Sequence, residues 1–249
     1  MKNCHTEKLT IDDTNVDFNM SVPITELMKL FEVATFKHSN IIGLDHVSIQ
    51  KHSNAFWVVT KMKVIPKGEI CVNDKIKVTT WTRELGYARA LRDCAIKVGN
   101  CVKAQFLAEW CCLDWDTRKL RRLNSIQYPE LEMEKTKYVK TEFTNLRETV
   151  EEKDFVYTHT VRSTDIDVNN HTNNLKYNYM AMNSFSVQEL KKIDIKEYEI
   201  YFVNESYEGD SIDIYKKKVK NYYYIEGKSQ DKTIFKVVIK FKNKKEERA

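Results

Sequence analysis

Two stretches of the 249-residue chain repeat apolar side chains every three or four positions, the spacing of one face of an α-helix. The first is SVPITELMKLFEVATF (residues 21–36), with Ser21 as a candidate N-cap and Pro23 in the first turn. Its predicted buried stripe is Ile24, Leu27, Phe31 and Ala34. The second is NNLKYNYMAMNSFSVQEL (residues 173–190), and its predicted stripe is Leu175, Tyr179, Met182 and Phe185.

After each predicted helix the period changes to two, which is typical of half-buried β-strands. The runs after the first helix are KIKVTTW (75–81), ALRDCAIKV (90–98) and AQFLAEWCCLDW (104–115). The runs after the second are EIYFV (199–203), SIDIY (211–215), YYYI (222–225) and TIFKVVIKF (233–241). A helix followed by an antiparallel meander therefore occurs twice, and the sequence predicts an α+β fold.

A tandem repeat explains this order. The charged stretch YPELEMEKTKYVKTE suits a linker around residues 128–145, so we expect one domain over 1–130 and another over 131–249. A shift of about 150 residues aligns DFNMSVPITEL (17–27) with DVNNHTNNLKY (167–177). Asp17 then meets Asp167, Asn19 meets Asn169, and Ser21 meets His171. The two helix entrances are predicted to be copies, of which only the second has an imidazole.

The run DIDVNNHTNN (165–174) has three interpretations, and the first is a calcium loop. Asp165, Asp167 and Asn169 have the spacing of ligands 1, 3 and 5 of an EF-hand. That loop also requires glycine at position 6 and a bidentate glutamate at position 12. Here those positions are Asn170 and Lys176, and a lysine in place of the closing carboxylate argues against calcium.

The second and third interpretations concern a helix cap and an active site. Asn173 or His171 would cap the following helix, and acids suit its positive end. If the approach to the helix is extended, Asp167, Asn169 and His171 project to one side. A carboxylate, an amide and an imidazole beside free helical N–H groups suit acyl transfer, so both interpretations stay open.

This run resembles the D-L-D-x-N-x-H-V-N-N motif of the acyl-acyl carrier protein thioesterases, the plant-type and bacterial fatty-acyl-ACP hydrolases. ALRDCAIK, AEWCCLDWDTRKLRRL and YFVNESYEGD follow as further family landmarks, in the expected order, and cover most of the chain. The resemblance implies a tandem double hot-dog fold, in which a long helix is wrapped by an antiparallel sheet in each domain. It also implies that the second domain is catalytic and that the first shapes the acyl-chain pocket.

The resemblance assigns site residues by motif position. The implied catalytic residues are Asp167, Asn169, His171 and Glu205, the last matching a glutamate proposed to activate water. Backbone N–H groups near Asn173 would bind the oxyanion. The position after the glutamate is often cysteine in plant members, but it is Ser206 here, and the C-terminal half contains no cysteine. We therefore expect direct attack by water.

The strand NAFWVVTKMKV (54–64) supplies the candidate substrate-binding residues, Trp57 and Met62. Strict alternation would place Phe56, Val58, Thr60 and Met62 on one face, and Trp57, Val59 and Lys61 on the other. One face would pack in the core. In the resemblance some of these side chains also touch the tail of the acyl chain.

Composition limits the alternatives. Hydrophobic residues make up 42% and charged residues 31%, as in a globular protein, and no apolar run is long enough to span a membrane. The first residues, MKNCHTEKLTIDD, contain no secretory signal, so we expect a cytoplasmic protein. The six cysteines lie in the first half without a C-x-x-C pair, so no metal site or cofactor is indicated and most should be buried thiols.

The net charge of +5 bears on partners. Lysines cluster in KKKVK (216–220) and KNKK (242–245), either as solvated faces or as a surface for an acidic partner. No nucleic-acid motif accompanies them. The resemblance implies acyl carrier protein bearing a fatty acyl chain as the partner, and a reaction that releases free fatty acid and ends elongation in fatty acid biosynthesis. Acyl-CoA hydrolysis, a non-catalytic acyl-binding hot-dog protein, the preferred chain length and a homodimer all stay open.

Overall fold

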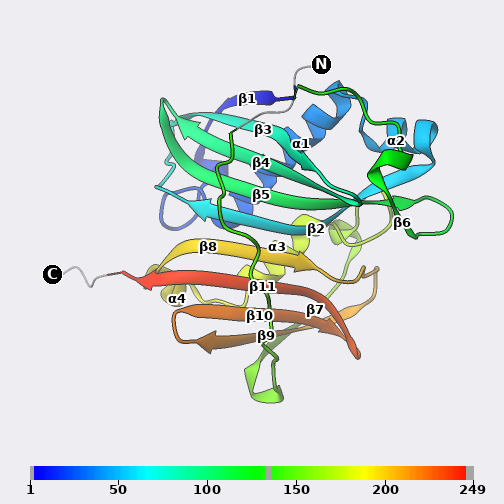
Figure 1. Cartoon of the computed structure of the whole chain (residues 1–249). Coiled ribbons are helices and arrows are strands. Elements are labelled where there is room, and N and C mark those ends of the chain that lie inside the picture. Colours follow the sequence, from blue (N-terminus) through cyan, green and yellow to red (C-terminus); the bar gives the residue numbers. More distant parts are fainter. Residues whose placement is uncertain (1–2, 133–135, 245–249) are drawn as a thin grey trace. The chain divides into compact units, whose positions relative to one another are not determined.

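The computed structural model describes residues 3–132 and 136–244. The chain forms two compact units, Met1–Glu142 and Phe143–Ala249. Each unit combines an antiparallel sheet with helices (Figure 1), which confirms the expected α+β class. The division between the units falls inside the stretch expected as a linker, of which residues 133–135 lie outside the described residues.

The first unit has the strand order β1-β3-β4-β5-β2, and every neighbouring pair is antiparallel. The bounds are β1 (His5–Thr10), β2 (Ala55–Pro66), β3 (Lys75–Leu85), β4 (Arg89–Val98) and β5 (Cys101–Asp114), with β6 (Leu120–Arg121) paired to β5. The helices are α1 (Ile24–Ile41), α2 (His46–Ser53) and the 3₁₀ helices η1 (Asp13–Asn15) and η2 (Leu123–Ser125). In Figure 1, α1 lies across one face of this sheet.

Helix α1 buries the predicted stripe. Its four stripe residues, Ile24, Leu27, Phe31 and Ala34, are all buried. The ring of Phe31 stacks on Phe106 of β5 with the centroids 5.2 Å apart, which fixes the helix to the sheet. The N-cap is Pro23, without a side-chain hydrogen bond, so the prediction of Ser21 as the cap is wrong. Ser21 instead belongs to a preceding turn, where its carbonyl accepts the N–H of Asp17.

Strand β2 departs from strict alternation. Val59 pairs with Trp110 and Lys61 with Glu109, so Thr60 forms a β-bulge. A bulge adds one residue and reverses which side chains share a face. Trp57 and Met62 therefore face the same side of the sheet, and the prediction of opposite faces is wrong.

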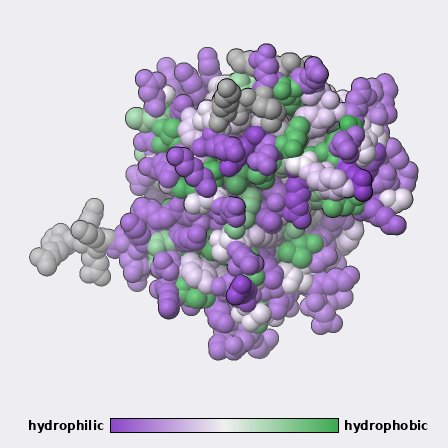
Figure 2. Space-filling model, viewed as in Figure 1, coloured by the Kyte–Doolittle hydropathy of each residue, from purple (hydrophilic) through white to green (hydrophobic). Residues whose placement is uncertain are grey.

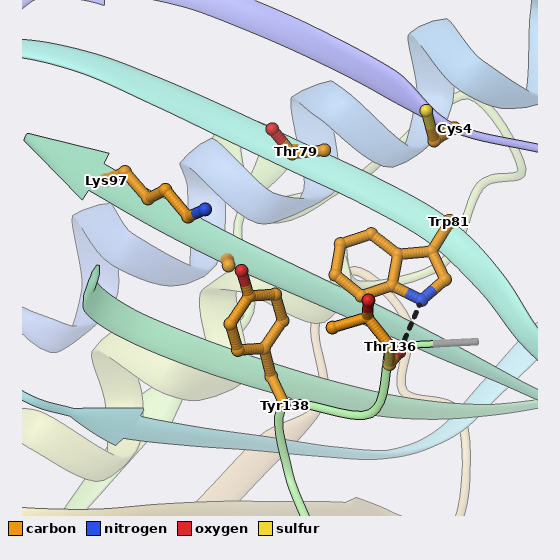
Figure 3. A pocket seen from close by; sticks show the side chains of 7 residues that line it. Cys4, Thr79, Trp81, Lys97, Thr136 and Tyr138 are labelled. Carbon is orange, nitrogen blue, oxygen red and sulfur yellow. Dashed lines mark hydrogen bonds between the residues drawn. The ribbon is translucent and has the colours of Figure 1, made fainter. Parts of the chain in front are cut away.

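The chain after the first sheet folds back over the other face of that sheet. Trp81 Nε1 donates to the carbonyl oxygen of Thr136 at 3.2 Å, and Arg83 donates to that of Val139 at 2.7 Å. Figure 3 shows Trp81, Thr136 and the Tyr138 ring around a shallow pocket, with Lys97 on the same side. These contacts explain why residues 136–142 belong to the first unit.

The second unit has the strand order β8-β11-β10-β9-β7, again antiparallel throughout. The bounds are β7 (Phe155–Thr160), β8 (Ile193–Phe202), β9 (Ser211–Val219), β10 (Tyr222–Ser229) and β11 (Lys232–Asn243). Its helices are α3 (Asn174–Met182), α4 (Val187–Lys191), η3 (Glu152–Asp154) and η4 (Ser163–Asp165). The alternating residues of β11, namely Phe235, Val237, Ile239 and Phe241, are buried.

The second helical pattern forms two helices instead of one. Ser186 accepts the N–H of Glu189 and starts α4 as a separate helix. The predicted stripe is wrong for α3, because Tyr179 is exposed while Tyr177 and Asn178 are buried. Asn178 accepts the hydroxyl of Tyr198 at 2.9 Å, so a polar residue enters this core with its partner.

The lysines of KKKVK only partly match the prediction of a solvated face. On the face drawn in Figure 2, hydrophilic residues predominate over hydrophobic ones. Within KKKVK, however, Lys216 donates to Ser184 O and Glu189 at 2.7 Å, and Lys218 lies over the Tyr223 ring, so these lysines also fasten the fold. Lys245 of KNKK lies outside the described residues.

All six cysteines are free thiols, but only Cys94, Cys111 and Cys112 are buried, so the expectation that most are buried is wrong. Within the described ranges, no helix is both long and apolar enough to cross a membrane.

Candidate active site

The motif around His171 forms a tight turn. The N–H of Asp167 donates to His171 O at 2.8 Å, and that of Asn170 donates to Asp167 O at 3.1 Å. Asn170 has φ 62°, a left-handed conformation that asparagine tolerates better than most residues. The expected extended approach is therefore wrong, because the chain reverses between Asp167 and His171.

The side chain of Asp167 holds this turn together. Its Oδ1 accepts the N–H of Asn169 at 2.8 Å and lies 3.5 Å from the N–H of His171. Its Oδ2 lies 3.5 Å from Asn169 Nδ2. Such side-chain acceptance two residues ahead is the usual way in which aspartate stabilises a turn. The Asp167 carboxylate thus accepts hydrogen bonds mainly from backbone N–H groups and stabilises the turn.

The turn brings His171 to Glu205, which follows β8. His171 Nε2 lies 3.4 Å from Glu205 Oε2. The His171 side chain is 20% exposed and that of Glu205 is 49% exposed, so the pair sits at the surface of the second unit with water access. An imidazole next to a carboxylate can exchange protons with a bound water or substrate.

Ser206 links the segment that carries Glu205 to the segment that begins α3 through hydrogen bonds. Its carbonyl oxygen accepts the N–H of Thr172 at 2.8 Å, and its hydroxyl lies 2.7 Å from Thr172 Oγ1 and 2.9 Å from Tyr177 OH. All three residues are buried. The Ser206 hydroxyl is thus engaged in a hydroxyl cluster away from solvent. We name Ser206, Thr172 and Tyr177 the hydroxyl cluster. Sequence reasoning missed Thr172 and Tyr177, whose only signal was a hydroxyl beside the motif.

Tyr207 is a second residue that the sequence did not reveal. Its hydroxyl donates to Glu205 Oε2 at 3.2 Å. Its ring meets the imidazole of His171 edge-on, with the centroids 5.2 Å apart and an interplanar angle of 84°. Tyr207 therefore contacts both members of the pair.

Asn173 has a different role from the expected one. Its side chain caps α3 by accepting the N–H of Leu175 at 2.8 Å. Its own N–H donates to Asp165 O at 2.8 Å, so this group is already used and the prediction of Asn173 as an oxyanion donor is corrected. The next N–H, that of Asn174, meets no acceptor within residues 3–132 and 136–244. At the start of α3 the N–H of Asn174 is therefore available to an acceptor, whereas those of Asn173 and Leu175 are not.

Asp165 belongs to a neighbouring structural cluster. Burial favours its neutral form, but the N–H of Arg162 and the His159 ring, 2.9 Å away, hold the pKa of Asp165 below its ordinary value. Lys176 Nζ lies 3.6 Å from the same carboxylate. The acids of the apparent calcium loop are thus committed to protein donors. In the described part of the chain, no group of three or more histidines, cysteines and acids is arranged to hold a metal.

The first unit contains the same turn. Asp17 accepts the N–H of Asn19 at 2.8 Å, the N–H of Asp17 donates to Ser21 O at 3.0 Å, and Met20 has φ 58°. Ser21 occupies the position of His171, as the alignment predicts.

The segment that carries Glu205 is repeated too. Cys71 and Tyr207 each donate a backbone N–H at 2.9 Å to the aspartate three residues ahead. This superposes Cys71 on Tyr207 and places Glu69 at the position of Glu205. The copy in the first unit therefore keeps the turn and the glutamate but has neither the imidazole nor the phenol.

Trp57 and Met62 lie in the first unit, on β2. The Trp57 ring meets Tyr128 edge-on at 6.4 Å, beside a buried cluster that includes Ile49 of α2. Met62 is buried and pairs with Ala108 on β5. Met62 thus lies in the apolar interior of this unit and Trp57 is partly buried, and their assignment as substrate-binding residues stays a prediction.

The sequence matches two protein-family models in order. The acyl-ACP thioesterase N-terminal domain covers residues 2–127, and the acyl-ACP thioesterase C-terminal domain covers residues 148–249. The chain belongs to the acyl-ACP thioesterase family. This confirms the resemblance, and with it the tandem hot-dog fold.

Solved structures agree on the fold of this acyl-ACP thioesterase family member. An acyl-ACP thioesterase from Bacteroides thetaiotaomicron has 20% identity and a TM-score of 0.86, with 96% of this chain and 98% of that chain covered. The 12:0-ACP thioesterase from Umbellularia californica has 16% identity and a TM-score of 0.84, with 97% and 98% covered.

A curated relative is the chloroplastic acyl-[acyl-carrier-protein] hydrolase FATB3 of Cuphea viscosissima, 25% identical over 210 residues. That match covers 74% of this chain, which spans about half (48%) of the length of the relative.

Proposed function

We propose that the protein hydrolyses the thioester of a fatty acyl-acyl carrier protein and releases the free fatty acid, which ends chain elongation. The observation that carries this proposal is the contact between His171 Nε2 and Glu205 Oε2 at 3.4 Å, formed by the two family motifs at a water-accessible surface. Membership of the acyl-ACP thioesterase family supports the same reaction.

In the proposed mechanism, Glu205 accepts a proton from a water molecule, whose oxygen attacks the thioester carbonyl carbon. His171 and Asn169 hold the water and the substrate. The developing oxyanion lies near the start of α3, where the N–H of Asn174 and the positive end of the helix stabilise it. The carbon–sulfur bond then breaks, and the thiolate leaves readily because a thiol has a pKa of about 8.5. It recovers the proton taken from water.

Asp167 and Ser206 support this reaction without forming a covalent bond to the substrate. Asp167 keeps His171 and Asn169 in place through the turn that it caps. Ser206 is buried with its hydroxyl bonded to Thr172 and Tyr177, so it does not act as a nucleophile. Hydrolysis then proceeds without an acyl-enzyme.

The direct test is His171→Ala, with Ser21→Ala in the equivalent turn of the first unit as its control. Loss of a group that moves or holds protons in the transition state should lower kcat by about 10²- to 10⁴-fold. Ser21→Ala should leave kcat unchanged. Near-normal hydrolysis of acyl-ACP by a folded His171→Ala protein, verified by circular dichroism, would refute the assignment.

The carrier is tested separately. Acyl carrier protein is small and acidic, and the chain has a net charge of +5, so attraction should be screened as salt rises. We expect the KM for acyl-ACP to increase between 50 and 300 mM salt by more than the KM for an acyl-CoA with the same chain. Equal salt responses together with faster turnover of the CoA ester would indicate an acyl-CoA thioesterase instead.

A further inference from the structure

We propose that Tyr207 is a positioning residue for the hydrolytic pair, holding the carboxylate of Glu205 and the imidazole of His171 in mutual contact. This inference rests on the proposed function and adds to it a residue outside the four matched catalytic positions. It depends on three observations: two contacts of the side chain, the anchoring of its backbone, and the equivalent position in the first unit.

The first observation is how the two oxygens of Glu205 are used. Oε2 lies 3.2 Å from Tyr207 OH and 3.4 Å from His171 Nε2. Oε1 has no protein partner within the described residues, so it is available to water. A glutamate that is 49% exposed would otherwise sample several rotamers, and a hydrogen bond to one oxygen selects the rotamer that faces the imidazole.

The ring of Tyr207 acts on the other partner. An edge-on arrangement at 5.2 Å is a favourable geometry for two aromatic rings, and it opposes rotation of the His171 side chain. Tyr207 thus restrains both groups at once. Neither contact requires the tyrosine to touch the substrate.

The second observation is that the backbone of Tyr207 is itself fixed. Its N–H donates to Asp210 Oδ2 at 2.9 Å, and its carbonyl accepts the N–H of Asp210 at 3.1 Å. The preceding residue, Ser206, is buried in the hydroxyl cluster. A side chain can position its neighbours only from a fixed base, and this segment supplies one.

The third observation comes from the copy in the first unit. That copy retains Glu69 at the glutamate position and the same backbone turn, but it has Ser21 in place of the histidine and Cys71 in place of the tyrosine. The glutamate thus occurs both with and without an imidazole, whereas the phenol occurs only beside the imidazole. This pairing is expected if the tyrosine serves the histidine and glutamate together.

The test compares Tyr207→Phe, which keeps the ring, with Tyr207→Leu, which removes both contacts. Tyr207→Phe should lower kcat roughly tenfold, as expected for one hydrogen bond to a charged group, with KM changed less than twofold. Tyr207→Leu should lower kcat further. The matched control is Tyr179→Phe, another exposed tyrosine of the same unit, which should keep wild-type kcat.

A double-mutant cycle decides whether the hydroxyl acts through Glu205. In a Glu205→Gln background, adding Tyr207→Phe should change kcat less than twofold, because the group that it positions is gone. A tenfold loss in that background would overturn the inference, as would a Tyr207→Phe enzyme with wild-type kcat or with only KM raised. If Glu205→Gln and His171→Ala remain active, the proposed function fails instead, so the two failures are distinguishable.

Discussion

Ser206→Ala tests the interpretation that Ser206 stabilises the site without attacking the substrate. The serine is fully buried, and its hydroxyl joins Thr172 at 2.7 Å and Tyr177 at 2.9 Å. Alanine removes both hydrogen bonds while the backbone bond from Thr172 N–H to residue 206 remains. We therefore expect a less stable protein that still hydrolyses its substrate.

The magnitude follows from which partners are left unpaired. Thr172 Oγ1 still donates to the carbonyl oxygen of residue 206 at 3.1 Å, so losing the Ser206 hydroxyl costs little free energy at this atom. Tyr177 OH loses its 2.9 Å partner inside a buried environment, which also raises the pKa of this phenol. Leaving a buried hydroxyl unsatisfied costs about 1–3 kcal/mol. For a chain of this size each kcal/mol lowers Tm by about 2–4 °C.

The assay pairs thermal unfolding with steady-state hydrolysis of acyl-ACP. Ser211→Ala, at an exposed serine that begins β9, is the control and should leave Tm unchanged. The double variant Tyr177→Phe/Ser206→Ala should recover part of the lost stability, because it removes the unsatisfied hydroxyl. An unchanged Tm for Ser206→Ala would refute the hydrogen-bond account. Loss of turnover in the folded variant, with an acyl-serine trapped in the wild type, would refute the water mechanism.

Three other predictions concern the turn, the acid response and the pocket. Asp167→Ala should cost about 1 kcal/mol of stability and lower kcat, whereas Asp17→Ala should cost similar stability without loss of kcat; equal kcat values for both variants would contradict this. Burial lowers the pKa of the His38 imidazole to about 3. The contribution of this neutral imidazole to the free energy of unfolding is therefore fully present above pH 6.5 and is lost as the pH falls toward 3. The Tm of His38→Gln should therefore fall less between pH 7 and pH 4.5 than that of the wild type, and parallel curves would exclude His38 as the cause. Trp57→Ala and Met62→Ala should shift the preferred acyl-chain length, since one or two methylenes change binding by about 1–3 kcal/mol; unchanged profiles in folded variants would assign both side chains to core packing alone.

Periodicity predicted the fold well wherever backbone pairing is regular. The stripe of α1 is buried as expected, and so are the alternating residues 235–241 of β11, which follow the irregularity in its pairing with β10 at Ile234. The errors fall where one residue interrupts the period. The bulge at Thr60 reverses the faces of β2, and Ser186 divides the second helix. The bulge depends on the pairing with β5, which no periodicity shows. The break at Ser186 is local, because Ser186 and Glu189 form a capping box whose S-x-x-E spacing is present in the sequence but does not alter the helical period.

The site was predictable in its residue types but not in its geometry. The motif assigned His171 and Glu205, and the structure brings these two side chains together. The extended approach was wrong because Asp167 stabilises a turn in which Asn170 takes a left-handed conformation. Asp and Asn favour such turns, so the residue types pointed to a turn although the alternation pointed to a strand. The sequence patterns also did not identify Tyr207. Its hydroxyl contacts Glu205 two residues earlier and its ring contacts His171 on another segment, and neither contact follows from a periodic pattern.

The two copies of the turn distinguish a residue that makes its shape from a residue that its shape does not explain. Asp17 and Asp167 each accept the backbone N–H of the residue two positions ahead at 2.8 Å. Asp17 does so in the copy without an imidazole and Asp167 in the copy with one. An aspartate that performs the same local task in both places is explained by the turn alone. His171 is not explained in this way, because Ser21 at the same position leaves the turn intact. The aspartate and the glutamate occur in both copies, so the imidazole and the phenol of Tyr207 are what set apart the copy for which hydrolysis is proposed.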